Sequence, residues 1–123
     1  MDYGAHVPLV LLPIHIAGQR TADAVEAALV KIPFKCDIVE CTATARDSGG
    51  TSPTLAIDVQ VGTTSILDDP VDITAGAVAT GTLTNTVSGV AVADGAEISV
   101  DLDVGGTSPT WDDITVLLTL ARN

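Results

Sequence analysis

The sequence predicts an all-β protein: a jelly-roll-like antiparallel β-sandwich of about eight short strands with an extended N-terminal arm. Three observations support this fold class. Val, Ile and sixteen Thr residues are prominent in the composition, and such β-branched residues suit a pleated surface. Several segments alternate apolar and polar residues with a period of two, which is typical of half-buried strands. Turn signals separate these segments at regular intervals, as they do in sandwiches and jelly rolls.

The first element is an apolar arm over residues 1–20, ahead of a single sandwich domain over residues 21–123. Pro8 and Pro13 interrupt the arm, and proline removes backbone donors and disfavours the helical region, so the arm should be extended. Burying each of its apolar side chains is worth about 1.5–3 kcal/mol. The arm therefore supplies the candidate partner-binding residues Val7, Pro8, Leu9, Val10, Leu11, Leu12, Pro13, Ile14 and Ile16.

Two interpretations of the arm remain open. It can be an edge strand of its own sandwich, or it can reach a neighbouring chain as an added strand or a groove-bound peptide. Both hold if the arm is exchanged between protomers. Residues 21–34 are also ambiguous, since Asp23 and Glu26 form a capping-box-like pair that would begin a helix. The alternation of Val25, Ala27 and Leu29 favours a strand instead.

The remaining strands follow from the period-two pattern. Asp94-Gly95 indicates a two-residue hairpin turn, and the loops are expected at 47–50, 68–70 and 105–106. The clear strands cover 39–45, 55–61, 98–104 and 114–120, and weaker ones are expected at 71–74, 80–86 and 90–93.

One hexapeptide, GGTSPT, occurs twice, at 49–54 and 105–110. The simpler interpretation is a repeated hairpin connection between strands. The functional interpretation is a pair of loops at one end of the sandwich that is available for contact. The candidate loop contacts are Thr51, Ser52, Pro53, Thr107, Ser108, Pro109 and Trp111.

The charge is strongly negative and unevenly distributed. A net charge of −11 argues against nucleic acid as a partner, because binding a phosphate backbone needs a basic face. Up to Arg46 there are five acidic and four basic residues, whereas eleven acidic residues and Arg122 follow. The nearly neutral end is the easier one to dock.

Membrane insertion and secretion are not expected. No run reaches the roughly 18 apolar residues that a membrane span needs. The segment 7–16 resembles the apolar region of a signal peptide, but an acidic residue precedes it and two prolines interrupt it. Cys36 and Cys41 lie five residues apart, which in a regular strand puts them on opposite faces and argues against a bridge between them.

The chemistry of an enzyme is missing from the sequence, so no enzymatic activity and no cofactor are expected. His6 and His15 both lie in the arm, far in sequence from any strand-borne nucleophile. The acidic residues Asp101, Asp103 and Asp112 have the spacing of a calcium loop. Their segment alternates as a strand, however, so two solvent-facing carboxylates and an acidic loop are favoured, and no metal site is predicted.

The segments ALVKIPFKCDI at 28–38 and ARDSGGTSPTLAIDV at 45–59 resemble small β-rich structural proteins of tailed phages. These are the capsid decoration (cement) proteins and the head-fibre or minor virion proteins. The segment DVGGTSPTWDDITV at 103–116 is similar to the same group. The resemblance implies a jelly-roll-like sandwich, often a homotrimer, seated on the outer shell where capsomers meet.

Together these features predict a virion structural protein that binds the outer capsid surface and bridges neighbouring capsid subunits. Its expected partners are the major capsid protein and further copies of itself, with assembly in the host cytoplasm. The alternative is a receptor- or glycan-binding module of a phage fibre or tail, with Trp111 as its candidate aromatic platform. A fibre protein is usually longer than 123 residues, which favours the decoration protein.

Overall fold

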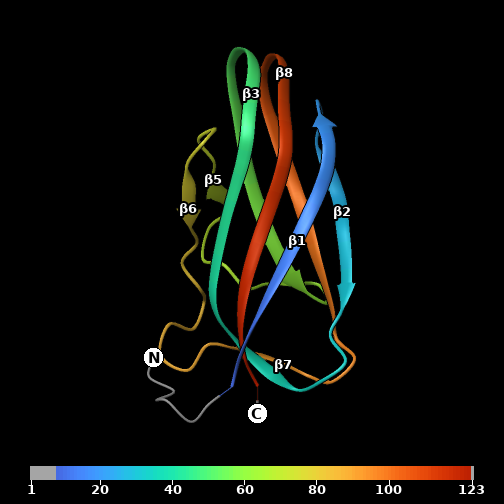
Figure 1. The fold of residues 1–123 in the computed structure, drawn as a ribbon, viewed down its shortest axis with the longest axis vertical. Helices are drawn as coiled ribbons and strands as arrows, with labels where there is room; N and C mark the ends of the chain where they lie inside the picture. Colours follow the sequence, from blue (N-terminus) through green and yellow to red (C-terminus); the bar gives the residue numbers. More distant parts are fainter. Residues whose placement is uncertain (1–7, 123) are drawn as a thin grey trace.

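A computed structural model describes residues 8–122, and these residues form eight strands and no helix (Figure 1). No helix in that part of the chain is therefore long and apolar enough to cross a membrane. All strand pairings are antiparallel, as predicted. The strands are β1 (Leu9–Arg20), β2 (Ala24–Lys31), β3 (Cys36–Val61), β4 (Thr64–Ser65), β5 (Val71–Asp72), β6 (Val78–Thr80), β7 (Val90–Val92) and β8 (Glu97–Arg122).

Two of the strands, β3 and β8, are 26 residues long and bend back on themselves at one end of the molecule, which we call the apex (Figure 1). Each has a first and a second half on the two sides of its bend. The first half of β3 pairs with the second half of β8, and the second half of β3 pairs with the first half of β8. This folded ribbon is the centre of a jelly-roll-like sandwich.

The sandwich has two layers. The front sheet contains β1, the second half of β8, the first half of β3, and β6 with β7. The back sheet contains β2, the first half of β8, the second half of β3, and β4 with β5. Strands β1 and β2 therefore form one edge of the sandwich, and β4 to β7 form the other.

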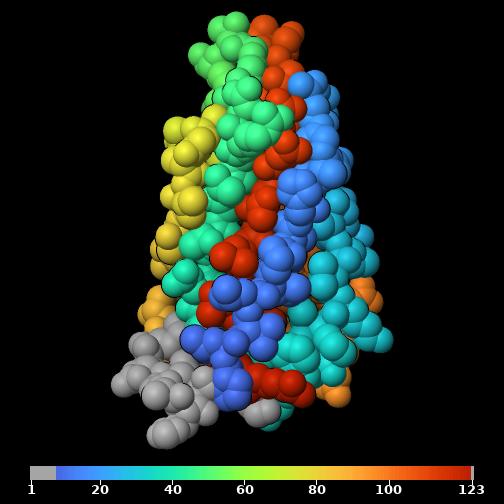
Figure 2. Space-filling view, in the orientation of Figure 1, coloured from blue at the N-terminus to red at the C-terminus, as the bar shows by residue number. Residues whose placement is uncertain are grey.

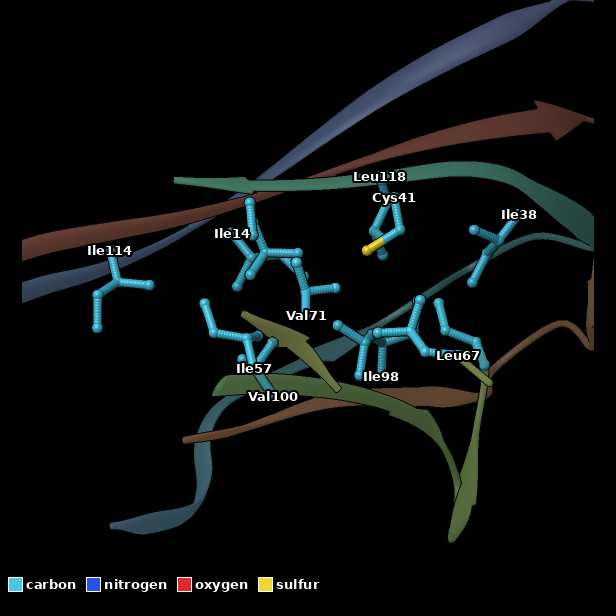
Figure 3. Close-up of a cluster of buried hydrophobic side chains, with 14 of the residues drawn as sticks. Ile14, Ile38, Cys41, Ile57, Leu67, Val71, Ile98, Val100, Ile114 and Leu118 are labelled. Atoms are coloured by element: carbon cyan, nitrogen blue, oxygen red, sulfur yellow. The ribbon is translucent and has the colours of Figure 1, made fainter. Parts of the chain in front are cut away.

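The core lies between the two sheets and is built from the inward phase of the alternating segments (Figure 3). Ile14, Cys41 and Leu118 reach into it from the front sheet, and Ile57 and Val100 reach into it from the back sheet. The predicted inward phases at 55–59, 98–102 and 114–120 are all confirmed by burial.

A bulge in β3 changes the predicted position of the cysteines. The register shifts between Ile38 and Glu40, so that an extra residue sits in this strand. Ile38 and Cys36 are buried on one side of the bulge, and Cys41 is buried on the other. The prediction that the two cysteines face opposite sides is therefore wrong, because it assumed an unbroken period of two. Both thiols are free.

Burial, and to a smaller extent the nearby Asp58 and Glu40 carboxylates, raise the pKa of the Cys41 thiol from its ordinary 9.0 to about 12. The folded protein thus keeps a proton that the unfolded chain releases above pH 9. This contribution to stability is complete below pH 9 and is lost as the pH rises towards 12. We expect urea unfolding curves to show a loss of stability between these pH values that is smaller in Cys41→Val, where only the raised pKa of the Cys36 thiol still contributes. An equal loss in that variant would contradict the assignment.

Several predicted connections differ from the structure. Asp94-Gly95 forms a turn, but it joins β7 in the front sheet to β8 in the back sheet, so it is no hairpin. No strand covers 80–86: only Thr80, the last residue of β6, and Leu83, in an isolated bridge with Leu67, make sheet pairings there. The segments 47–50 and 105–106, expected as loops, lie inside β3 and β8.

Candidate interaction surfaces

Residues 9–20, predicted as an arm, form edge strand β1 of the sandwich, so the described chain has a single core. β1 pairs with β8 from Leu9 opposite Ala121 to Arg20 opposite Trp111. The interpretation of an edge strand in the chain's own sandwich is therefore the one that the structure adopts. The alternate apolar residues of this segment lie opposite the core-facing residues of β8, as Ile14 lies opposite Val116, and this match explains why the segment packs there.

The candidate arm residues separate into two groups. Ile14 and Ile16 are buried, and the half-buried Val10 and Leu12 pack against the core, so these four contribute to the chain's own core. Pro8, Leu9, Leu11 and Pro13 are exposed. Val7 lies outside the described residues.

The repeated hexapeptide forms the apex, where its two copies pair with each other. The first glycine of each copy faces the last threonine of the other, Gly49 with Thr110 and Gly105 with Thr54. The backbone also repeats, with φ of +94° at Gly50 and +107° at Gly106. The two copies are thus related by a local two-fold axis. Neither is a hairpin loop, because each carries its strand from one sheet to the other.

The hydroxyl-bearing candidates of the apex are accessible. Thr51, Ser52, Thr107 and Ser108 are exposed, and Pro53 and Pro109 are half-buried. Ser52 and Ser108 both have φ of +49°, a conformation that favours glycine. The bend therefore requires a left-handed backbone at the same two positions in each copy.

Trp111 is not an exposed contact residue. Its side chain is 2% exposed, and its indole Nε1 donates a hydrogen bond of 3.1 Å to the carbonyl of Thr54. The prediction of a loop contact or glycan platform at Trp111 is wrong. Trp111 follows the bend of β8, at a position of the strand whose side chain points into the core. The tryptophan anchors the apex to the core.

The aspartates that have the spacing of a calcium loop do not come together in the fold. Asp101 lies in the first half of β8 and Asp112 in the second, so they belong to different sheets. Asp101 Oδ1 accepts a hydrogen bond of 2.9 Å from the backbone of Glu26 instead. Within residues 8–122, no group of three or more His, Cys, Asp or Glu side chains is placed to hold a metal ion. His15 Nδ1 lies 2.9 Å from Thr115 Oγ1 on the neighbouring strand.

The outer surface of the front sheet, which we call the front face, is nearly uncharged. In the middle of this face, Leu117 of β8 lies opposite Pro13 of β1 on one side and opposite Thr42 of β3 on the other. The first half of β3, the second half of β8 and β1 cross this face in Figure 2. Its charged residues are Glu40 and, next along the strands from Thr44 and Thr115, the ion pair of Arg46 with Asp113. The uncharged part of the face consists of Leu11, Pro13, His15, Thr42, Thr44, Val78, Thr80, Thr115, Leu117 and Thr119.

The outer surface of the back sheet, the back face, is acidic. Asp58 and Asp101 stand directly opposite each other, and Asp103 and Asp72 flank Ala56 in the next row. Gln60 Nε2 donates hydrogen bonds of 3.3 Å to both Asp58 and Asp101. These four aspartates would be costly to bury against a partner without basic side chains.

The chain matches no protein-family model, and no curated protein is significantly similar to it. Two solved structures align with it. A chain of the cyanophage Pam1 capsid asymmetric unit is 17% identical, with 100% of this chain and 89% of that chain covered and a TM-score of 0.41. A chain of the infectious bursal disease virus Gx strain is 10% identical, with 94% and 37% covered and a TM-score of 0.40. At these scores neither alignment identifies a fold family or a function for this chain.

Proposed function

We propose that this chain is a structural protein of a phage particle that binds the outer capsid surface and stabilises the shell by bridging neighbouring capsid subunits. The contrast between the two faces of the sandwich carries the proposal. The front face offers threonines, Pro13 and Leu117, with Glu40 and the mutually paired Arg46 and Asp113 as its charged residues, whereas the back face offers four aspartates. A partner can cover the front face at little desolvation cost, and the back face stays in solvent.

The sequence resemblance to decoration and head-fibre proteins supports the same function. In this proposal the front face contacts the major capsid protein, three copies associate into a homotrimer, and the protein joins the particle in the host cytoplasm. Each contact is modest, and many copies per shell give a large total stabilisation through avidity. The activity is mechanical and uses no cofactor.

The test is binding of the purified protein to expanded phage capsids that lack it, followed by heating of the loaded shells. Saturable binding that raises the temperature of shell disruption is the expected result. Thr42→Glu places a charge in the middle of the front face and should weaken shell binding by about tenfold or more, since a buried unpaired charge is costly.

The matched control is Thr64→Glu, which adds the same charge on exposed β4 at the other edge of the back sheet. It should leave shell binding unchanged. Equal binding by Thr42→Glu and the wild-type protein would show that the front face is not the docking surface. No binding to shells by any variant would refute the proposed function itself.

A further inference from the structure

Among the charged residues of the front face, Glu40 alone has no ionic partner within residues 8–122. Arg46 and Asp113 neutralise each other through a contact of 2.6 Å between Nε and Oδ2. Glu40 lies in β3 opposite Thr119, and its side chain is exposed without an ion pair in the described chain. The front face therefore presents one unpaired negative charge on a surface that is otherwise neutral.

The bulge in β3 places an apolar side chain beside this carboxylate. The register shifts between Ile38 and Glu40, so Val39 is the extra residue of the strand. Ile38 and Cys41 are buried in the core, which leaves both residues between them outside it. A regular strand would turn one of the two inward. Bulges redirect side chains in this way next to functional sites.

Val39 and Glu40 line a hollow of about 290 Å³ at the border of the front face. β6 and β7 pair with β3 at 42–44 and 36–38, so the chain that joins them leaves the sheet where the bulge lies (Figure 1). This chain forms the other wall of the hollow. It contributes Thr80, Gly81, Thr82, Leu83 and Thr86. The hollow thus combines two apolar side chains, three hydroxyls and one carboxylate.

The wall opposite Glu40 is held against β3 at both of its ends. At one end, Gly81 N donates a hydrogen bond of 2.9 Å to the carbonyl of Cys41. At the other end, Gly89 with φ of +79° lies so close to β3 that an added Cβ would be 2.6 Å from the carbonyl oxygen of Ile38. The hollow is therefore already formed in the free protein, and such preorganisation lowers the cost of binding.

The composition of the hollow fits the side chain of a lysine or an arginine. Such a side chain has an aliphatic stem, which suits Val39 and Leu83, and a charged head, which suits Glu40. The threonine hydroxyls are further acceptors for its N–H groups. The volume lies just below the roughly 300–1,000 Å³ of small-molecule sites, so a single side chain is the appropriate occupant.

The proposed docking of the front face requires a cation at this place. A partner that covers the face also covers Glu40, and a buried carboxylate without a partner is costly. The chain supplies no free basic side chain on this face, because Arg46 is already paired with Asp113. The covering protein must therefore bring the positive charge.

We infer that the shell protein presents a lysine or arginine side chain that enters the hollow beside β3 and pairs with Glu40. The inference rests on the proposed function, because it names the residue type by which the front face recognises its partner. A partner with a neutral or acidic side chain at this position leaves Glu40 unpaired and is rejected. The contact thus supplies specificity and fixes the register of docking.

Glu40→Gln tests this contact in the binding of the protein to expanded capsids. The amide has nearly the shape of the carboxylate and the side chain is exposed, so the variant should fold as the wild type does. It leaves the incoming cation unpaired and should weaken shell binding by about tenfold or more. The matched control is Glu97→Gln, which makes the same change at an exposed position of the back sheet and should bind as the wild type does.

The direction of the change is decisive. If the hollow takes no cation, Glu40→Gln removes a costly unpaired charge from the docking surface. The variant would then bind shells as tightly as the wild type or more tightly, and either result would overturn the inference.

A titration without shells tests the hollow separately. N-acetylarginine amide, added to isotope-labelled protein, should shift the backbone amide resonances of residues 80–86 in a saturable way. The neutral N-acetylglutamine amide should leave them unchanged, and so should the arginine probe with Glu40→Gln. Resonances that do not respond to the arginine probe in the wild-type protein would overturn the inference.

The two measurements separate this inference from the proposed function. Shell binding that survives in Glu40→Gln refutes the inference and leaves the function standing. A protein that takes the arginine probe but ignores capsids refutes the function and leaves the cation site standing. Self-association that depends on Glu40 in sedimentation velocity would assign the incoming side chain to a second copy and overturn its assignment to the shell protein.

Discussion

Trp111→Ala is expected to destabilise the fold by about 3–5 kcal/mol, the usual cost of removing a large buried aromatic side chain. Trp111 is 2% exposed, and its indole donates a hydrogen bond to the Thr54 carbonyl in the second half of β3. The substitution therefore leaves a cavity at the apex and removes a link between the two bent strands. Chemical denaturation followed by circular dichroism measures the loss.

Trp111→Phe serves as the control, because it keeps most of the apolar volume and removes the N–H donor. It should cost less than the alanine variant, with about 1 kcal/mol of its loss due to the hydrogen bond. If Trp111→Ala unfolds at the same denaturant concentration as the wild type, the tryptophan does not anchor the apex. Exposed residues of the apex, such as Thr51, should tolerate alanine with little change.

Gly106→Ala is expected to cost more than about 2 kcal/mol, because two penalties add. A φ of +107° is strained for any residue with a Cβ, at roughly 1–2 kcal/mol. An added Cβ would also lie 2.6 Å from the carbonyl oxygen of Ser52, and this neighbour is backbone that cannot rotate away. The pseudo-symmetric Gly50→Ala should show a similar loss, since its Cβ would strike the carbonyl of Ser108.

Gly62→Ala separates the two penalties. Gly62 has φ of +63°, but no atom lies within 4 Å of a Cβ built there. Its alanine variant should therefore show the conformational cost alone, as a smaller shift of the unfolding midpoint. Equal midpoints for the three alanine variants would contradict the close packing of the two hexapeptides.

Much of the fold follows from local patterns. The periods of 55–61, 98–104 and 114–120 determine which side chains face the core, because a half-buried strand places every second residue inside. The all-β class follows from the same alternation. The period fails at Val39, where the bulge inserts a residue, and no local signal marks a bulge that depends on the neighbouring strand.

The role of GGTSPT depends on long-range pairing. A sequence repeat with two glycines indicates a bend, and a hairpin is the shortest way to make one. In the structure the partner of each copy is the other copy, 56 residues away, so the bend joins two sheets. The burial of Trp111 follows from this arrangement, which the local sequence around it does not contain.

The candidate surfaces also depend partly on local sequence and partly on long-range strand pairing. The sequence by itself determined the composition of the core, the strand phases, the acidic character and the lack of catalytic motifs, because these depend on residue type and near-neighbour spacing. The tertiary structure alone decided that the arm is an edge strand and that four aspartates from three different strands meet on the back face. These properties arise where strands distant in sequence become neighbours, and a linear pattern carries no record of which strands will pair.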